Sequence, residues 1–326
     1  MLKFDQIIQK IDQLEEANIL LAALELKIFS ILDKKLLSVR AIAQKAGSQP
    51  WETEQLLNAL VSMGALSKKD GLFKNTSETY KHLCSTSPHF KKGFVRLRQE
   101  NRDEWAGLLE TLRNGRDPSS HEEDDDPDFR WFFTHAMHER SELYSSKVAE
   151  IVARKPVGRL IDLGGGPGSY SAAILRKDKN ATATLFDRKA TLEVAKDILS
   201  PSKVFSRFDF LEGDLFDTGY GENFDTVLFS NILHIYNPKE NKVLFKKIHR
   251  ALVPGGRFIL VDLFLREDKT DPYDAALFSL TMLMFTATGK TYTFKETEAL
   301  LKATGLASFK RFPLTEGTSL IEAVKK

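Results

Sequence analysis

A glycine-rich turn lies near the middle of the chain, between an apolar segment and a helical pattern. The apolar segment covers residues 159–163, the glycine-rich turn covers 164–168, and the helical pattern begins near Tyr170. Glycines at a turn from strand to helix permit positive φ, and they let a ligand approach the backbone amides at the start of the helix. The turn therefore predicts a site for a nucleotide-type ligand.

An acidic residue ends the next predicted strand. Asp187 follows the apolar segment 182–186 and comes about 20 residues after the glycine turn. A carboxylate at this place can accept both hydroxyls of a ribose. A glycine turn alone is weak evidence, because such turns also serve tight packing. The two features together are much more specific for a nucleotide.

Two further features separate the possible nucleotides. A dinucleotide fingerprint that starts at Gly164 would need a glycine at position 169, which is Ser169. Residues 213–216 follow the third predicted strand and offer the Asp214 carboxylate to an adenine amine and the Phe216 ring to the base. Taken alone, Asp214 is equally explained as a turn residue and Phe216 as a core aromatic residue. In series, the three motifs favour the adenosine of S-adenosylmethionine over a dinucleotide.

These motifs need a sheet that gathers the ends of its strands. From residue 159 onward, short apolar strands alternate with helices, which is typical of a parallel, doubly wound sheet. The predicted strands cover residues 159–163, 182–186, 208–212, 224–229 and 257–263. Residues 309–314 and 319–324 are joined by a Thr-Glu-Gly turn and predict an antiparallel hairpin that closes the sheet. The predicted fold class is α/β and Rossmann-like.

The first 90 residues follow another pattern. Apolar residues recur at three- and four-residue intervals, helices are predicted at 39–46 and 51–63, and a small hairpin is predicted at 65–74. This order predicts a winged-helix domain that is all-helical apart from the hairpin. The expected division is a winged-helix domain at 1–90, a helical linker at 91–150 and a cofactor-binding domain at 151–326.

A winged helix also occurs in transcription regulators, so DNA binding is the competing interpretation. The helix that would enter the major groove, 51–63, carries Glu52 and Glu54 and no Lys or Arg. The whole chain is nearly neutral, with Lys+Arg 47 against Asp+Glu 45. Contacts with phosphates and bases need the opposite charge. The sequence therefore favours subunit packing, and no nucleic-acid partner is expected.

The order of the motifs resembles that of a known family. Residues 162–168, 187, 213–216, 230–234 and 252–256 follow one another as in class I S-adenosylmethionine-dependent small-molecule O-methyltransferases, which include caffeate, acetylserotonin and bacterial polyketide enzymes. The resemblance covers nearly the whole chain, because that family also has an N-terminal winged-helix dimerisation domain, and it implies a homodimer. It implies cofactor contacts by Gly164, Gly166, Gly168, Asp187, Gly213, Asp214, Leu215, Phe216 and Ser230.

Methyl transfer to a hydroxyl requires an aligned acceptor and removal of its proton. His234 follows the strand at 224–229, on the same rim as Asp187 and Asp214, and the resemblance implies that it is the base. Asp262 matches the first of two acidic residues that support the base in the family. The second would fall at Thr291, which cannot act as a carboxylate. A histidine that only caps or packs in the rim is the alternative.

Two apolar stripes are candidates for an acceptor pocket. They lie on the helix after residue 128 and on the helix that carries Phe278, and such stripes are usually core. In the resembling family these two helices line the acceptor site, so the resemblance implies an apolar, aromatic acceptor. The candidate acceptor contacts are Phe133, Met137, Phe278 and Met282.

Several other site types are not expected. The acidic run at 121–128 predicts a solvated loop, and no metal site is expected there. Cys84 is the single cysteine, so the chain has no second thiol for an intramolecular disulfide. No apolar run is long enough to cross a membrane. A cytoplasmic, reducing environment is expected.

The predicted function is S-adenosylmethionine-dependent methyl transfer to a hydroxyl of a small apolar or aromatic metabolite. His234 is the expected general base, and Asp262 is expected to orient it. The alternatives are a C- or N-methyltransferase of the same fold, in which His234 only orients the acceptor, a cofactor-binding relative without catalysis, and a winged-helix regulator.

Overall fold

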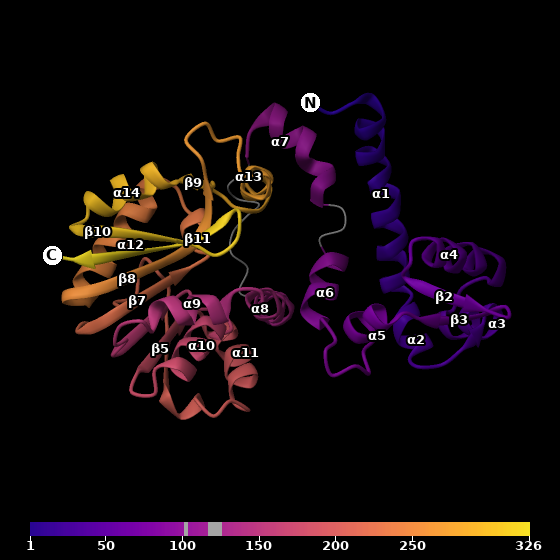
Figure 1. Cartoon of the computed structure of the whole chain (residues 1–326), viewed down its shortest axis with the longest axis horizontal. Coiled ribbons are helices and arrows are strands. Elements are labelled where there is room, and N and C mark those ends of the chain that lie inside the picture. The colour runs from indigo at the N-terminus through magenta and orange to yellow at the C-terminus, as the bar shows by residue number, and fades with distance from the viewer. Residues whose placement is uncertain (101–103, 117–125) are drawn as a thin grey trace. The chain divides into compact units, whose positions relative to one another are not determined.

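The computed structural model describes residues 1–100, 104–116 and 126–326. The chain divides into two compact units, Met1–Asp103 and Glu104–Lys326. Figure 1 follows the order of their elements along the chain. The finer three-part division at residues 90 and 150 stays a prediction. No helix among the described residues is both long and apolar enough to cross a lipid bilayer.

The N-terminal unit is mostly helical. Ser38 accepts a hydrogen bond from the amide of Ala41 and so caps α3, which ends where Gly47 takes a φ of 68°. Three short strands form an antiparallel sheet in the order β1-β3-β2, of which β2 and β3 are the predicted hairpin. The elements are α1 (Phe4–Glu25), α2 (Ile28–Leu32), β1 (Leu37–Ser38), α3 (Val39–Ala46), α4 (Pro50–Ser62), β2 (Leu66–Lys69), β3 (Leu72–Asn75), α5 (Ser77–Leu83) and α6 (Lys92–Glu100).

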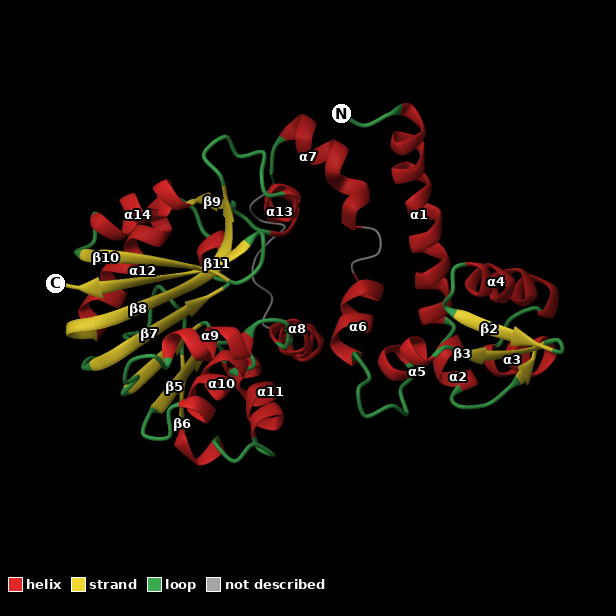
Figure 2. Ribbon diagram, in the orientation of Figure 1, coloured by secondary structure: helices red, strands yellow, loops and turns green. Residues whose placement is uncertain are grey.

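The C-terminal unit is built on one large sheet, shown in yellow in Figure 2. Its strand order is β10-β11-β8-β7-β4-β5-β6, with β9 paired to β8. Strands β4 to β8 run parallel to their neighbours in this group, whereas β11 is antiparallel to both β8 and β10. The α/β class and the closing hairpin are therefore confirmed. The strands are β4 (Arg159–Leu163), β5 (Thr182–Asp187), β6 (Phe208–Glu212), β7 (Phe224–Ser230), β8 (Leu252–Leu265), β9 (Tyr292–Thr293), β10 (Leu306–Pro313) and β11 (Thr318–Lys325).

Helices cover both faces of this sheet. One buried cluster joins α9, α10 and α11 to the sheet, and a second cluster joins α12 and α14 to its other face. Both faces of the central strands are therefore withdrawn from water, as a parallel sheet requires. The helices are η1 (Glu104–Gly107), α7 (Leu108–Asn114), α8 (Pro127–Ser141), α9 (Ser145–Val152), α10 (Ser169–Lys177), α11 (Lys189–Leu199), η3 (Phe205–Arg207), η4 (Leu233–Ile235), α12 (Pro238–Ala251), α13 (Tyr273–Phe285) and α14 (Phe294–Lys302).

Strand β8 starts earlier than the sequence pattern indicates. It begins at Leu252 and passes through Gly255, whose φ is 76°, before it pairs regularly with β7. The carboxyl ends of β4 to β8 lie at one edge of the sheet, where the loops after each strand meet. This edge is the usual ligand site of a doubly wound sheet.

Candidate active site

The turn after β4 has the backbone conformation that its glycines permit. Gly164, Gly166 and Gly168 have φ values of 63°, 54° and 68°. A Cβ on Gly164 would lie 2.7 Å from the side chain of Ile232, whereas a Cβ on Gly166 would meet nothing within 4 Å. Gly164 is therefore required by both conformation and packing, while Gly166 borders open space in which a ligand can approach the backbone.

Asp187 lies against this turn. Its Oδ2 accepts a hydrogen bond of 2.8 Å from the amide of Gly166, and its Oδ1 accepts one of 2.8 Å from the amide of Arg188. Burial raises the pKa of the Asp187 carboxyl above its ordinary value, although these hydrogen bonds act in the opposite direction. Each carboxylate oxygen has a second lone pair, so a ribose hydroxyl can still bind here.

Hydrogen bonds to Asp214 and from Lys247 hold the loop after β6 in place. Asp214 Oδ1 accepts hydrogen bonds from the amides of Phe216 at 2.7 Å and Asp217 at 3.3 Å. Lys247 Nζ donates to three backbone oxygens of the loop, those of Leu215 at 2.7 Å, Phe216 at 2.7 Å and Thr218 at 2.9 Å. The loop therefore presents Asp214 and Phe216 on a backbone that has little freedom.

Gly213 and Ser230 are two further candidates for cofactor contact. A Cβ on Gly213 would lie 2.6 Å from the side chain of Thr218, so only glycine fits there. Ser230 is buried at the end of β7, next to Asn231, which has a φ of 58°. The structure places both residues at the same sheet edge as Asp187 and Asp214.

His234 and Asp262 form a buried pair. His234 Nδ1 lies 2.6 Å from Asp262 Oδ1, and the other carboxylate oxygen, Oδ2, accepts a hydrogen bond of 3.3 Å from the amide of His234. The amide of Leu263 also donates to Oδ1 at 2.7 Å. A proton on Nδ1 is therefore stabilised by the carboxylate, which leaves Nε2 as the basic nitrogen of a neutral imidazole.

The acceptor candidates are only partly brought together. The ring of Phe278 meets the imidazole of His234 edge-on, with centroids 4.8 Å apart. Phe133 instead stacks on Phe129 within α8, with centroids 5.4 Å apart. Met282 is buried in α13, and Met137 is partly buried in α8.

Two polar residues of α8 reach this edge and were not singled out by the sequence. His138 Nδ1 lies 2.8 Å from Ser169 Oγ, at the start of the helix that follows the glycine turn. The guanidinium of Arg140 lies 5.9 Å from the centroid of the Phe278 ring, and Arg140 also acts electrostatically on Tyr170. Both follow the apolar stripe directly in sequence, which is the local signal that could have found them.

The comparisons with known proteins decide the family. A model of the O-methyltransferase domain matches residues 115–307, and a model of the O-methyltransferase dimerisation domain matches residues 10–83. The chain belongs to the O-methyltransferase family. It is an enzyme family whose members use S-adenosylmethionine, and the expected family and cofactor are thereby confirmed.

Similar proteins span nearly the whole of this O-methyltransferase. The 3-hydroxy-5-methyl-1-naphthoate 3-O-methyltransferase of Streptomyces sahachiroi is 26% identical over 94% of this chain and 91% of its own. The acetylserotonin O-methyltransferase of Gallus gallus is 28% identical over 94% of this chain and 92% of its own. The solved structure of PigF with SAH has a TM-score of 0.88 and 25% identity, and the match covers 99% of this chain and 100% of that one.

Thr291 stands where the resemblance led us to expect the second acidic residue, and it is buried. Thr291 is 2% exposed, and within the described ranges its hydroxyl has no hydrogen-bond partner. Asp262 is therefore the carboxylate that this structure places on the imidazole. Thr291 leaves the second place without a charge.

The acidic run lies mostly outside the described residues, which resume at Asp126. There the carboxylate of Asp126 caps α8 by accepting a hydrogen bond of 2.8 Å from the amide of Phe129. Within the parts of the chain that are described, no cluster of three or more His, Cys, Asp or Glu residues could hold a metal ion.

Proposed function

We propose that this enzyme transfers the methyl group of S-adenosylmethionine to a hydroxyl of a small apolar or aromatic metabolite. The observation that carries the proposal is the buried pair of His234 and Asp262, which lies at the same sheet edge as the glycine turn and Asp187. A base held at the carboxyl edge is what removal of a hydroxyl proton requires.

The residues at this edge match the chemistry of the cofactor. Open space borders Gly166, the Asp187 carboxylate suits the ribose, and the Asp214 and Phe216 loop suits the adenine. Arg140 is proposed to bind the cofactor carboxylate, because its guanidinium lies 5.9 Å from the centroid of the Phe278 ring and acts electrostatically on Tyr170. When bound, S-adenosylmethionine supplies a methyl group on a positively charged sulfur. The proposed cofactor contacts are Gly164, Gly166, Gly168, Asp187, Gly213, Asp214, Leu215, Phe216 and Ser230.

His234 is proposed to accept the hydroxyl proton on Nε2. Asp262 holds the opposite nitrogen, so it fixes the tautomer and then stabilises the positive charge that develops on the ring. Phe278 packs on the imidazole and leaves an apolar wall beside it. The named relatives act on a naphthoate and on acetylserotonin, and an aromatic acceptor is proposed here as well.

The N-terminal unit is proposed to form a homodimer. Residues 10–83 match the dimerisation domain of the family, and α1 carries exposed apolar side chains. Burial of such a row against a second copy is favourable.

Calorimetry tests the cofactor. The protein is expected to bind S-adenosylhomocysteine and not NAD, and the reverse result would refute the proposal.

Substitution of Arg140 tests its role. Arg140→Met should weaken the binding of S-adenosylhomocysteine about tenfold, because one charge-assisted hydrogen bond is lost. Arg154→Met is the matched control, because Arg154 also lies over a phenylalanine ring, 5.7 Å from the centroid of Phe312. Equal affinities for the two variants would remove Arg140 from the site.

Substitution of the base tests the reaction. His234→Ala is expected to lower the rate of transfer to a hydroxyl acceptor about 1000-fold. His249→Ala is the control, because His249 lies on α12 and packs against Gly305. Turnover of His234→Ala near that of the wild type would return His234 to a packing role.

Product analysis by NMR tests which atom is methylated. It separates a methyl ether from a methyl group on carbon or nitrogen, and a methyl group on carbon or nitrogen would contradict O-methylation.

A further inference from the structure

The turn that carries His234 has little structure of its own. It is the single 3-10 turn η4, closed by one internal hydrogen bond of 3.0 Å from the amide of Ile235 to the oxygen of Ile232. Short 3-10 turns have poor hydrogen-bond geometry and depend on their surroundings. The position of the imidazole is therefore set by groups outside the turn.

Asn241 holds the turn on both sides of His234. Its side chain is fully buried, and its Nδ2 donates to the oxygen of Leu233 at 2.9 Å and to the oxygen of Tyr236 at 2.9 Å. One amide group thus fixes the backbone directly before the base and two residues after it.

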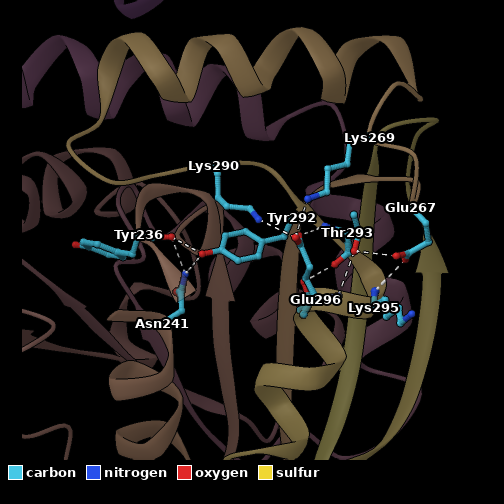
Figure 3. Close-up of polar contacts among 10 residues, drawn as sticks. Tyr236, Asn241, Glu267, Lys269, Lys290, Tyr292, Thr293, Lys295 and Glu296 are labelled. Atoms are coloured by element: carbon cyan, nitrogen blue, oxygen red, sulfur yellow. Dashed lines mark hydrogen bonds and ion pairs between the residues drawn. The ribbon is translucent and has the colours of Figure 1, made fainter. Parts of the chain in front are cut away.

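Tyr292 completes this contact from β9. Its hydroxyl donates to the oxygen of Tyr236 at 2.6 Å and lies 3.0 Å from Nδ2 of Asn241, as Figure 3 shows. Burial raises the pKa of the Tyr292 hydroxyl above its ordinary value, so the group stays protonated and remains a donor. β9 pairs with β8, the strand that carries Asp262. Tyr292 and Asp262 are therefore held in place by the same pair of strands.

The segment that carries Tyr292 is itself anchored. The amide of Lys290 donates to the oxygen of His234 at 2.9 Å, and a Cβ at Gly289 would collide with that oxygen. Lys290 and Lys269 both bind Glu296, at 2.8 Å and 3.0 Å, and Figure 3 shows this ion pair network beside Tyr292. These contacts lower the pKa of Glu296 to about 2, so the carboxylate stays charged and the network persists near neutral pH.

We propose that Asn241 and Tyr292 are positioning residues for the base. They hold the carbonyl groups on both sides of His234 so that the imidazole stays aligned with Asp262 and presents Nε2 to the acceptor. This inference rests on the proposed function of His234. A displacement of about 1 Å in such a group costs up to about 100-fold in rate, so the contact matters for catalysis beyond its effect on stability.

The kinetic test uses Tyr292→Phe, which keeps the ring in the core and removes only the hydroxyl. We expect kcat at saturating substrates to fall about tenfold, with the KM for S-adenosylmethionine unchanged within twofold. Thr226→Val is the matched control, because the buried Thr226 hydroxyl also donates to a backbone oxygen, that of Val157 at 2.8 Å, near the start of β7 and away from the site. An equal fall of kcat in both variants, or no fall in Tyr292→Phe, would overturn the proposal.

A mutant cycle asks whether the effect passes through His234. In the His234→Ala background, measured with a long assay, Tyr292→Phe should change the residual rate by less than twofold, because there is no base left to position. A further tenfold loss in that background would show a general effect on the fold and would contradict a positioning role.

A measurement without acceptor separates this inference from the function it rests on. In nitrogen-15 labelled protein, the Nδ1 proton of His234 should exchange with water at least tenfold faster in Tyr292→Phe than in the wild type or in Thr226→Val. Unchanged exchange refutes the proposed positioning even if the enzyme methylates a hydroxyl. Faster exchange in a protein that methylates no hydroxyl supports the positioning and refutes only the proposed reaction.

Discussion

Asp162 is a carboxyl group that the fold keeps from water directly behind the glycine turn. It is 0% exposed, Ser171 donates a hydrogen bond to its Oδ2, and its Oδ1 has no hydrogen-bond partner within the described residues. Burial raises the pKa of Asp162 to about 7. An ordinary aspartate in an unfolded chain titrates near pH 4. The folded chain therefore binds this proton more tightly than the unfolded chain does.

This difference predicts a pH-dependent stability. Between about pH 4 and pH 7 the folded state holds more protons, so the free energy of unfolding falls as the pH rises and levels off above pH 7. Asp162→Asn removes the ionisation, and its stability relative to wild type should increase by about 3 kcal/mol from pH 5 to pH 8. Thermal unfolding across this range measures it. Asp197→Asn, at an exposed position, is the control, and a pH-independent difference for Asp162→Asn would contradict the account.

Thr291 gives a second prediction for a single residue. A buried hydroxyl without a partner costs about 1–3 kcal/mol, and valine has nearly the same shape. Thr291→Val should raise the free energy of unfolding by about 1 kcal/mol and leave kcat within twofold. Thr226→Val is the matched control, because the buried Thr226 hydroxyl donates to the oxygen of Val157 at 2.8 Å and its loss should destabilise. A tenfold fall of kcat in Thr291→Val would instead assign this hydroxyl to the acceptor.

At the scale of elements, helix α12 serves two loops of the site. Asn241 near its start holds the turn that carries His234, and Lys247 further along holds the loop at 215–218. Desolvation lowers the pKa of Lys247, but the nearby Asp214 and Asp217 oppose this effect. One helix thus positions both the turn that carries the base and the adenine loop.

Lys247 can be tested separately from the base. Lys247→Met keeps much of the side chain but loses three hydrogen bonds to the adenine loop, so the dissociation constant of S-adenosylhomocysteine should rise about tenfold. kcat at saturating cofactor should stay within twofold, because the His234 turn is untouched. Lys242→Met, at an exposed position on the same helix, is the control in calorimetry. A fall in kcat without a change in cofactor affinity would refute this division between the loops.

The sequence predicted the elements that local rules determine. Ser38 and Gly47 mark the ends of a helix through their own backbone preferences, and the apolar runs of β4, β5 and β7 reflect burial on both faces. The resemblance to the family implied the pair of His234 and Asp262, and the structure brings the two side chains into contact. Asn241, Lys247 and Tyr292 were not predicted, since a side chain that binds a distant backbone oxygen leaves no periodic signal. The extra residues of β8 before Arg257 were missed because Gly255 interrupts the apolar run.

At the scale of the whole molecule, helix α1 has more apolar surface than one copy of the chain covers. The side chains concerned recur at helical spacing and are all at least 40% exposed: Phe4, Ile7, Ile8, Ile11 and Leu14. Each such side chain contributes about 1.5–3 kcal/mol when it is fully buried. This row is the best candidate within the described residues for the surface that joins two copies in the proposed homodimer.

Ile11→Glu tests this surface directly. Ile11 is 62% exposed, so the substitution should leave the fold of one copy intact while it places a charge in the middle of the apolar row. The wild type should sediment as a dimer, and the dissociation constant of Ile11→Glu should be at least tenfold higher, since burial of an unpaired carboxylate is costly. Gln9→Glu adds the same charge on the opposite side of the helix and should not change it. A monomeric wild type, or equal dimer stability in both variants, would place subunit contact elsewhere or exclude it.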